Sequence, residues 1–124
     1  MPPTPPPVSD APWVVCLCAE WCGTCRDYRP LMRQVAQAHP QMRFAWVDIE
    51  DHADLADDFD VETFPTLLVA DAGGQRFLGP LLPNGQALSR LLGALPAAQP
   101  LQAHVRVLVE GIERDPAAFA LRPD

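Results

Sequence analysis

Two cysteines lie three positions apart at the point where a strand pattern gives way to a helix pattern. The segment AEWCGTC contains Cys22 and Cys25, which fall one helical turn apart. Cys22 falls at the expected helix N-terminus, where unpaired N–H groups and the helix dipole favour a thiolate. A thiolate attacks a disulfide, and a second thiol one turn further on can attack the mixed disulfide and release the product. The pair therefore predicts thiol–disulfide exchange, with Cys22 as nucleophile and Cys25 as resolving residue.

Two more cysteines, Cys16 and Cys18, leave other interpretations open. They are two apart on the preceding strand pattern, so their side chains point to one face. All four cysteines form C-x-C-x3-C-x2-C, a set of soft ligands for zinc, but structural zinc sites usually pair two short knuckles across a longer loop. Small buried cysteines are also ordinary core residues. We therefore expect no metal site, and a regulatory disulfide from Cys18 to the pair is the less favoured alternative.

Hydrophobic periodicity predicts the elements that position the pair. WVVCLC at 13–18 reads as a strand buried on both faces, and residues 23–38 read as a helix that Pro30 should kink. The order of the elements predicts an α/β sandwich whose first strands are parallel and whose last two form an antiparallel hairpin. The remaining predicted elements are strands at 42–49, 66–70 and 75–79, and helices at 53–60, 85–95 and about 100–114.

Composition restricts the class of protein. The chain has 124 residues, of which 48% are hydrophobic and 20% charged, as expected for one globular domain. The net charge of −7 argues against nucleic acid or anionic membranes as partners. All nine basic residues are Arg, which excludes Schiff-base chemistry and a P-loop.

The N-terminal sequence and the apolar runs bear on the compartment. No apolar run approaches the roughly 20 residues of a membrane span. The first twelve residues, MPPTPPPVSDAP, have neither the basic nor the apolar region of a signal peptide. We expect a cytoplasmic protein, or a periplasmic one if a signal was removed.

Three regions are expected along the chain. Six prolines make residues 1–12 a Pro-rich flexible segment. Residues 13–96 should form the domain, with Asn84 as an N-cap of its last helix. Residues 97–124 should be a helical extension that packs on the domain through an apolar stripe.

From about Trp13 to Leu95 the chain resembles the thioredoxin family. The resemblance rests on AEWCGTC, on Pro30 five residues after the second cysteine, on WVDIED at 46–51 and on FPT at 64–66. It implies a thioredoxin-like fold: a central mixed sheet of about four strands flanked by helices, here with an extra C-terminal helix. It also implies a protein dithiol–disulfide oxidoreductase, active in cell redox homeostasis. Such a protein acts on protein disulfides, takes electrons from a reductase or thiol pool, and needs no bound cofactor.

The resemblance further assigns the surroundings of the dithiol. In the family, the residue matching Pro65 is a cis-proline that faces the dithiol, and the backbone beside it pairs with the substrate chain. Trp21 matches an exposed aromatic residue next to the nucleophile. The motif and substrate groove are thus expected to comprise Trp21, Gly23, Thr24, Phe64, Pro65 and Thr66.

Several residues depart from the family pattern. Thr24 stands where proline is common, and Cys16 stands where many thioredoxins have a buried Asp that helps to deprotonate the second cysteine. Trp46 and Cys18 likewise replace a Lys and a Trp of the family. We therefore expect Cys25 to lose its proton slowly, and a slow resolving step near pH 7 unless Glu20 or water accepts the proton.

The sequence leaves two further questions open. Only the Pro-rich segment precedes Trp13, so we do not expect the family's first strand and helix in this sequence. The helix at about 100–114 is expected to cover the sheet face that the first helix would cover. The alternative is that its apolar stripe docks a partner or a second copy of the chain. A thioredoxin-like binding module with little turnover is the competing function, because a fold does not fix an activity.

Overall fold

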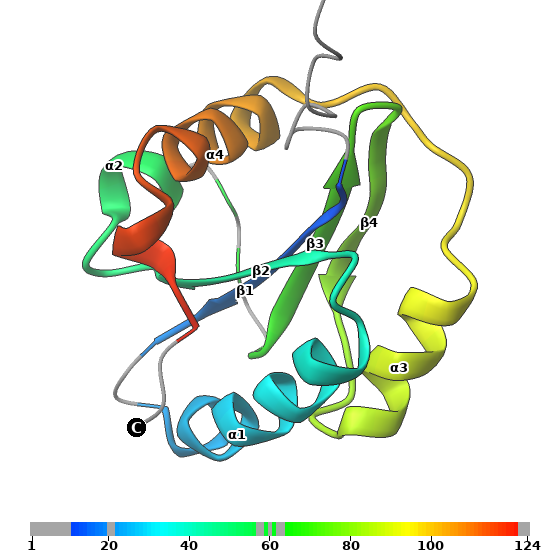
Figure 1. Cartoon of the computed structure of the whole chain (residues 1–124). Coiled ribbons are helices and arrows are strands. Elements are labelled where there is room, and N and C mark those ends of the chain that lie inside the picture. The colour runs from blue at the N-terminus through cyan, green and yellow to red at the C-terminus, as the bar shows by residue number, and fades with distance from the viewer. Residues whose placement is uncertain (1–10, 20–21, 57–58, 60, 62–63, 122–124) are drawn as a thin grey trace, which may run out of the picture.

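The chain forms a four-stranded mixed sheet between two layers of helices, as the sequence predicts (Figure 1). A computed structural model describes residues 11–19, 22–56, 59, 61 and 64–121. The strand order is β2-β1-β3-β4, with β1 parallel to β2 and antiparallel to β3, and β3 antiparallel to β4. In chain order the elements are β1 Trp13–Cys18, α1 Gly23–Ala38, β2 Arg43–Asp48, α2 Ala53–Ala56, β3 Thr66–Asp71, β4 Gly74–Pro80, α3 Gly85–Gly93, α4 Ala103–Arg114 and the 3-10 turn η2 Pro116–Phe119.

Strand β1 is buried along its whole length. All six of its residues are buried, because β2 and β3 flank it in the sheet and helices cover both of its faces. Side chains alternate between those faces, as a strand requires. Val14, Cys16 and Cys18 therefore face α1 and α3, while Val15 and Leu17 face α2 and α4.

Helices α1 and α3 form the layer that covers the cysteine-bearing face. α1 continues through Pro30 and buries Tyr28 and Met32 against the sheet. α3 buries Leu88 and Leu92, and the side chain of Asn84 accepts a hydrogen bond of 2.7 Å from the Ala87 backbone N–H. The predicted N-cap is therefore confirmed.

Helix α4 lies on the opposite face, together with α2 and η2 (Figure 1). Its buried residues, Val105, Leu108 and Ile112, pack in one cluster with Val15 and Leu17 of β1. Leu101 and Val109 are partly buried against the same cluster. The apolar stripe read from the sequence thus packs on the sheet in this structure.

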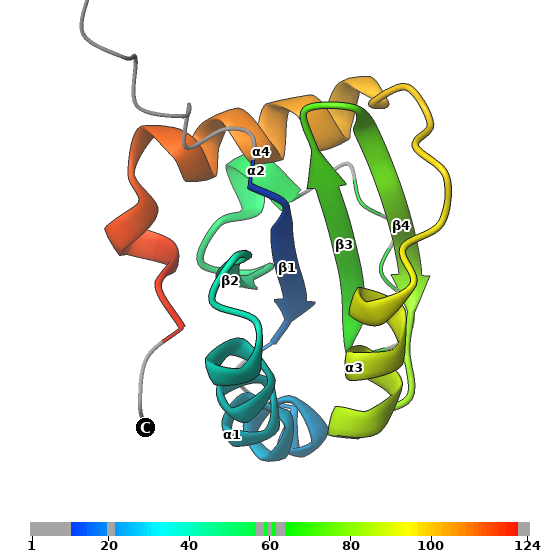
Figure 2. The same cartoon turned by 45° about the vertical axis from the view of Figure 1, so that its right-hand side comes forward.

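The C-terminal segment also reaches both outer strands of the sheet. Gln99 exchanges two backbone hydrogen bonds, of 2.7 and 2.8 Å, with Gln75 of β4. At the other side Ala120 forms an isolated antiparallel bridge with Ala45 of β2. Figure 2 shows the chain after α3 rising beside β4 before it enters α4. Each outer strand therefore gains a backbone partner from the segment that follows α3.

Differences from the predicted elements are confined to their ends. The bounds of β1 and α1 are as predicted, and those of the other elements shift by at most three residues, except that α2 is described only as Ala53–Ala56. The rest of the helix predicted at 53–60 lies mostly outside the described residues. η2 is not predicted, because a turn of Pro116–Phe119 is too short to show helical periodicity.

Replacing Gly74 with Ala should destabilise the fold. Gly74 has φ of +130°, and an added Cβ would collide with the Gln99 carbonyl oxygen. A residue with a side chain in this region of backbone space costs about 1–3 kcal/mol. We expect urea unfolding of Gly74→Ala to show a loss of at least that size.

The matched control is Gly93→Ala at the end of α3, where an added Cβ meets no atom within 4 Å. Alanine is the better helix former, so stability should be unchanged or rise by up to about 1 kcal/mol. Equal effects of the two substitutions would contradict the close approach of Gln99 to Gly74.

Truncating Leu108 tests whether α4 belongs to the core. Leu108 is fully buried, so Leu108→Ala should lower the free energy of unfolding by about 2–5 kcal/mol. Val107 is 46% exposed on the same helix, and Val107→Ala should change it by no more than about 0.5 kcal/mol. Similar small losses for both variants would show that α4 is not packed in solution.

Candidate functional site

The site lies where β1 ends and α1 begins. Cys22 is the N-cap of α1, with extended backbone angles (φ −85°, ψ 119°). Its N–H donates a hydrogen bond of 3.0 Å to the Ala19 carbonyl, and its carbonyl accepts one of 3.2 Å from the Arg26 N–H. These bonds turn the chain from strand to helix within a few residues. The turn brings Cys22 and Cys25 to the end of β1 nearest to Cys18.

Cys25 is bonded to Cys18, not to Cys22. The structure contains a Cys18–Cys25 disulfide whose Cα atoms are 5.9 Å apart, within the usual range of about 4.4–6.8 Å. Cys16 and Cys22 are free thiols. In this structure Cys25 is thus bonded to Cys18, and its expected redox partner Cys22 is a free thiol.

The position of Cys18 explains its pairing. It is the last residue of β1, and it faces α1 because strand side chains alternate. α1 folds back over that face from its first turn, which contains Cys25. The same-face spacing of Cys16 and Cys18 is the signal for this contact in the sequence, where a core role for Cys18 is favoured over a disulfide to the pair.

Cys22 is the accessible thiol of the group. It is partly exposed, whereas Cys16, Cys18 and Cys25 are fully buried. Cys22 also packs against the cluster that contains the two bonded cysteines. Among the described residues, no side chain caps the start of α1 with a hydrogen bond.

The buried position next to the disulfide holds a neutral group. Burial raises the pKa of the Cys16 thiol above its usual range, and the charge of Arg29 opposes only part of this shift. Burial, with a smaller effect of Cys16, also raises the pKa of Tyr28. The Tyr28 hydroxyl has no hydrogen-bond partner among the described residues. Neither group is therefore ionised near neutral pH, and neither supplies the charge of a buried carboxylate.

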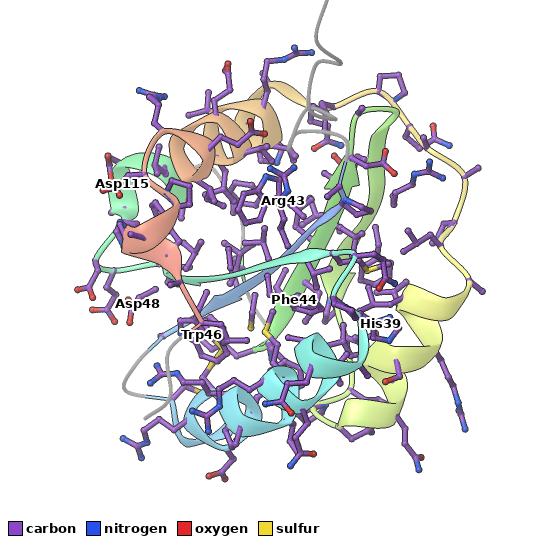
Figure 3. The ribbon with its side chains drawn as sticks, viewed as in Figure 1. His39, Arg43, Phe44, Trp46, Asp48 and Asp115 are labelled. Carbon is purple, nitrogen blue, oxygen red and sulfur yellow. A yellow bond between two sulfur atoms is a disulfide. The ribbon has the colours of Figure 1, made fainter. Side chains whose placement is uncertain are left out.

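Trp46 and Arg29 border the same face. Trp46 projects from β2 toward α1, and Arg43 projects from the same strand toward α4 (Figure 3). The Arg29 guanidinium lies 4.9 Å from the centre of the Trp46 ring, a cation–π contact. Trp46 is partly buried against the cysteine cluster and pairs in register with Cys16. An aromatic ring and an arginine therefore occupy this border, where the family pattern has a lysine.

The FPT segment lies at the start of β3. The Phe64–Pro65 peptide bond is cis, Pro65 is buried, and Thr66 is 7% exposed. Phe64 is partly buried against the cluster that contains Cys25. The Pro65 carbonyl accepts a hydrogen bond of 3.3 Å from the Leu81 N–H. The structure thus places Phe64 against the same cluster as the cysteines.

The other expected groove residues are only partly described. Gly23 and Thr24 are exposed at the start of α1. Nothing within 3.4 Å would meet a Cβ at Gly23, so the backbone there is open to a partner chain. Trp21 and Glu20 lie outside the described residues.

Two further findings concern a metal site and a membrane span. Two of the four cysteine sulfurs are bonded to each other in this structure, and in the described ranges no group of three or more His, Cys, Asp or Glu is placed to hold a metal. Within the same part of the chain, no helix has the length and apolarity needed to cross a membrane.

A separate hollow of about 770 Å³ lies at the side of the molecule near the C-terminal turn. The described residues that line it include Trp13, Arg33, Arg43 and Leu121, and none of the cysteines. Arg43 stacks over the Trp13 ring at 4.3 Å and donates hydrogen bonds to the Ala11 carbonyl. This hollow is therefore not part of the cysteine site.

Comparison with known proteins gives a consistent result. The sequence model of the family Thioredoxin matches residues 7–80. Mitochondrial thioredoxin of Mus musculus is 40% identical over 74 residues, which cover 57% of this chain and 45% of that protein. Thioredoxin-1 of Saccharomyces cerevisiae is 32% identical over 85 residues, which cover 68% and 71%.

Solved structures agree with the sequence matches. The X-ray structure of Fasciola hepatica thioredoxin aligns with a TM-score of 0.62 at 26% identity, covering 69% of this chain and 82% of that one. Thioredoxin of Trypanosoma brucei brucei gives 0.60 at 26% identity, covering 69% and 75%. The chain spans about half the length of the mitochondrial relatives that it matches. With its sheet, its cysteine motif and these matches, the chain belongs to the thioredoxin family.

Proposed function

We propose that this chain is a thiol–disulfide oxidoreductase that reduces or forms disulfides in other proteins, with Cys22 and Cys25 as its redox pair. One observation carries the proposal. A partly exposed thiol, Cys22, caps α1 one turn before a buried cysteine that is itself found in a disulfide. Family membership supports the same activity.

The reaction begins at Cys22. Its thiolate attacks one sulfur of a substrate disulfide, a mixed disulfide forms, and the other substrate sulfur leaves as a thiolate. Cys25 then attacks the Cys22 sulfur, the bond to the substrate breaks, and the second substrate thiolate leaves. The substrate gains two electrons and the pair becomes a disulfide. In the other direction, the oxidised pair passes its disulfide to a substrate dithiol.

The surroundings of the pair fit a protein substrate. Gly23 and Thr24 are exposed and leave the first turn of α1 accessible, and Phe64 lies against the same cluster. We propose that Trp21, Phe64, Pro65 and Thr66 frame the groove that receives the substrate chain. The open surface suits an extended peptide better than an enclosed small molecule.

The resolving step is expected to be slow at neutral pH. The buried position that faces the pair holds Cys16, whose raised pKa keeps it protonated. No carboxylate is therefore available there to take the proton from Cys25, and Glu20 or water is the proposed acceptor. Electrons for turnover come from a reductase or a thiol pool. The cytoplasm, where such donors keep thiols reduced, is the proposed compartment.

Replacing each cysteine of the pair tests this proposal. Cys22→Ser should lower the rate of protein-disulfide reduction by about a hundredfold or more, because a hydroxyl at neutral pH is not a comparable nucleophile. Cys25→Ser should trap a mixed disulfide between Cys22 and the substrate, visible as a covalent adduct by mass spectrometry.

The competing function, a binding module with little turnover, gives a different result. Substrate binding would survive either substitution, and Cys25→Ser would trap no adduct. Wild-type protein treated with an alkylating agent before the assay is the control, because blocking Cys22 should reproduce the loss seen with Cys22→Ser.

Alkylation of the reduced protein tests which thiol is the nucleophile. Cys22 is partly exposed, while Cys16 is fully buried and its pKa is raised. Brief treatment with iodoacetamide at pH 7–9 should label Cys22 at least about tenfold faster than Cys16. Labelling of Cys16 should stay low across that range, because its thiol remains protonated, and should appear on unfolding. Equal labelling in the native protein would contradict the assignment.

A further inference from the structure

Cys25 has two possible partners, and the structure shows it bonded to the partner that the expected reaction does not use. Cys22 lies one turn before Cys25 on α1, and Cys18 lies at the end of β1. All three pack in or against a single cluster. Cys25 can therefore be part of a surface disulfide with Cys22 or of an internal disulfide with Cys18.

The two disulfides differ in their access to solvent. Cys18 and Cys25 are both 0% exposed, whereas Cys22 is partly exposed. Thiol–disulfide exchange requires the attacking thiolate to reach a sulfur of the bond. An external thiol therefore cannot reach the Cys18–Cys25 bond while the fold is intact. Cys22, which packs against this cluster from the outside, is the thiol placed to attack it.

We propose that Cys18 is a third redox residue, which stores the oxidised state as a buried Cys18–Cys25 disulfide that forms and opens only through Cys22. This inference rests on the proposed Cys22–Cys25 activity. After the pair has been oxidised by a substrate, the Cys18 thiolate attacks the Cys25 sulfur. The Cys18–Cys25 bond forms, the Cys22–Cys25 bond breaks, and Cys22 leaves as a thiolate that takes up the proton lost by Cys18.

No electrons enter or leave in this exchange, so the protein stays oxidised by two electrons. The reverse step returns the disulfide to the surface: Cys22 attacks Cys25 and Cys18 leaves. Each direction requires a charged sulfur at the position of Cys18, where no solvent can stabilise it. A poorly stabilised leaving thiolate slows exchange. The internal disulfide should therefore open slowly and persist in reductant that would quickly reduce a surface pair.

The second free cysteine is not a competing partner. Cys16 is buried on the same face, but it is a free thiol in the structure, whereas Cys18 is bonded to Cys25. It therefore provides the matched control, as a buried cysteine of the same strand that the proposal does not use.

The sequence offers a direct assay for the two disulfides. Glu20 lies between Cys18 and Cys22, and no other Glu precedes it. Oxidised full-length protein is quenched with acid, its free thiols are alkylated, and the unfolded chain is cut by a glutamyl endopeptidase. A Cys18–Cys25 disulfide keeps the two fragments joined, whereas a Cys22–Cys25 disulfide leaves them separate.

We expect joined fragments as the main product from oxidised wild type and from Cys16→Ala, and separate fragments from Cys18→Ser. During reduction by dithiothreitol at pH 7, the disulfide of Cys18→Ser should disappear at least about tenfold faster than that of wild type. Cys22→Ser is oxidised while unfolded and then refolded, because the folded variant lacks the thiol through which the bond forms. Its fragments should stay joined, and its disulfide should disappear at least about tenfold more slowly than that of wild type. Cys22 is partly exposed, so this last variant does not depend on repacking of the core.

Two results would overturn the inference. The first is oxidised wild type that yields only separate fragments. The second is Cys22→Ser that is reduced as fast as wild type. Protein-disulfide reduction measured on the same samples separates this inference from the proposed function. If wild type reduces protein disulfides but yields only separate fragments, Cys18 has no redox role and the proposed activity stands. If wild type yields joined fragments but does not reduce protein disulfides, the proposed activity is wrong.

Discussion

Complete burial of β1 on both faces is the constraint on which the structure depends. A strand with six buried residues must be covered by apolar side chains above and below the sheet. α1 and α3 supply one cover, and α2, α4 and η2 supply the other. Without the second layer, Val15 and Leu17 would face water. Because α4 buries three residues against that face, the C-terminal helix is an integral part of the core.

The same constraint places the cysteines. Alternation along a fully buried strand directs Cys16 and Cys18 to the face that α1 covers, and α1 starts only five residues after the strand ends. Cysteines at the end of β1 and in the first turn of α1 are therefore forced into contact. Burial then determines their chemistry: Cys16 is held as a neutral thiol, while Cys22, at the edge of the cluster, retains access to solvent.

Much of this fold can be read from the sequence, because long apolar patterns depend on local periodicity. The uninterrupted WVVCLC run and the stripe ending at Ile112 predict a buried strand and a packed helix, and both lie where the patterns place them. The Asn84 cap is local too, since its side chain bonds to a residue three positions on. By contrast, the contacts of Gln99 with β4 and Ala120 with β2 join residues far apart in sequence. No periodic pattern encodes such contacts.

The candidate site likewise has one part that local sequence predicts and another that depends on contacts between distant residues. The motif around Cys22 is recognisable from its spacing, and the chemistry of a cysteine at a helix N-terminus follows from general principles. The sequence does not favour the Cys18–Cys25 bond, because packing alone is enough to explain a cysteine in a predicted core strand. The bond becomes apparent only in the tertiary structure, where α1 folds back over the end of β1 and places Cys25 beside Cys18. Local sequence therefore identifies the nucleophile, and tertiary structure identifies its neighbours.

Contact of the C-terminal segment with both outer strands affects the order in which the molecule can be completed. During synthesis, β1 to β4 emerge well before the residues around Ala120, so the nascent sheet has one uncovered face and two unpaired edges. Such intermediates aggregate readily and are the usual clients of chaperones. Pairing of the two outer strands also depends on contacts between residues far apart in sequence, and such contacts form slowly. The sheet is thus completed only after the residues around Ala120 have been synthesised.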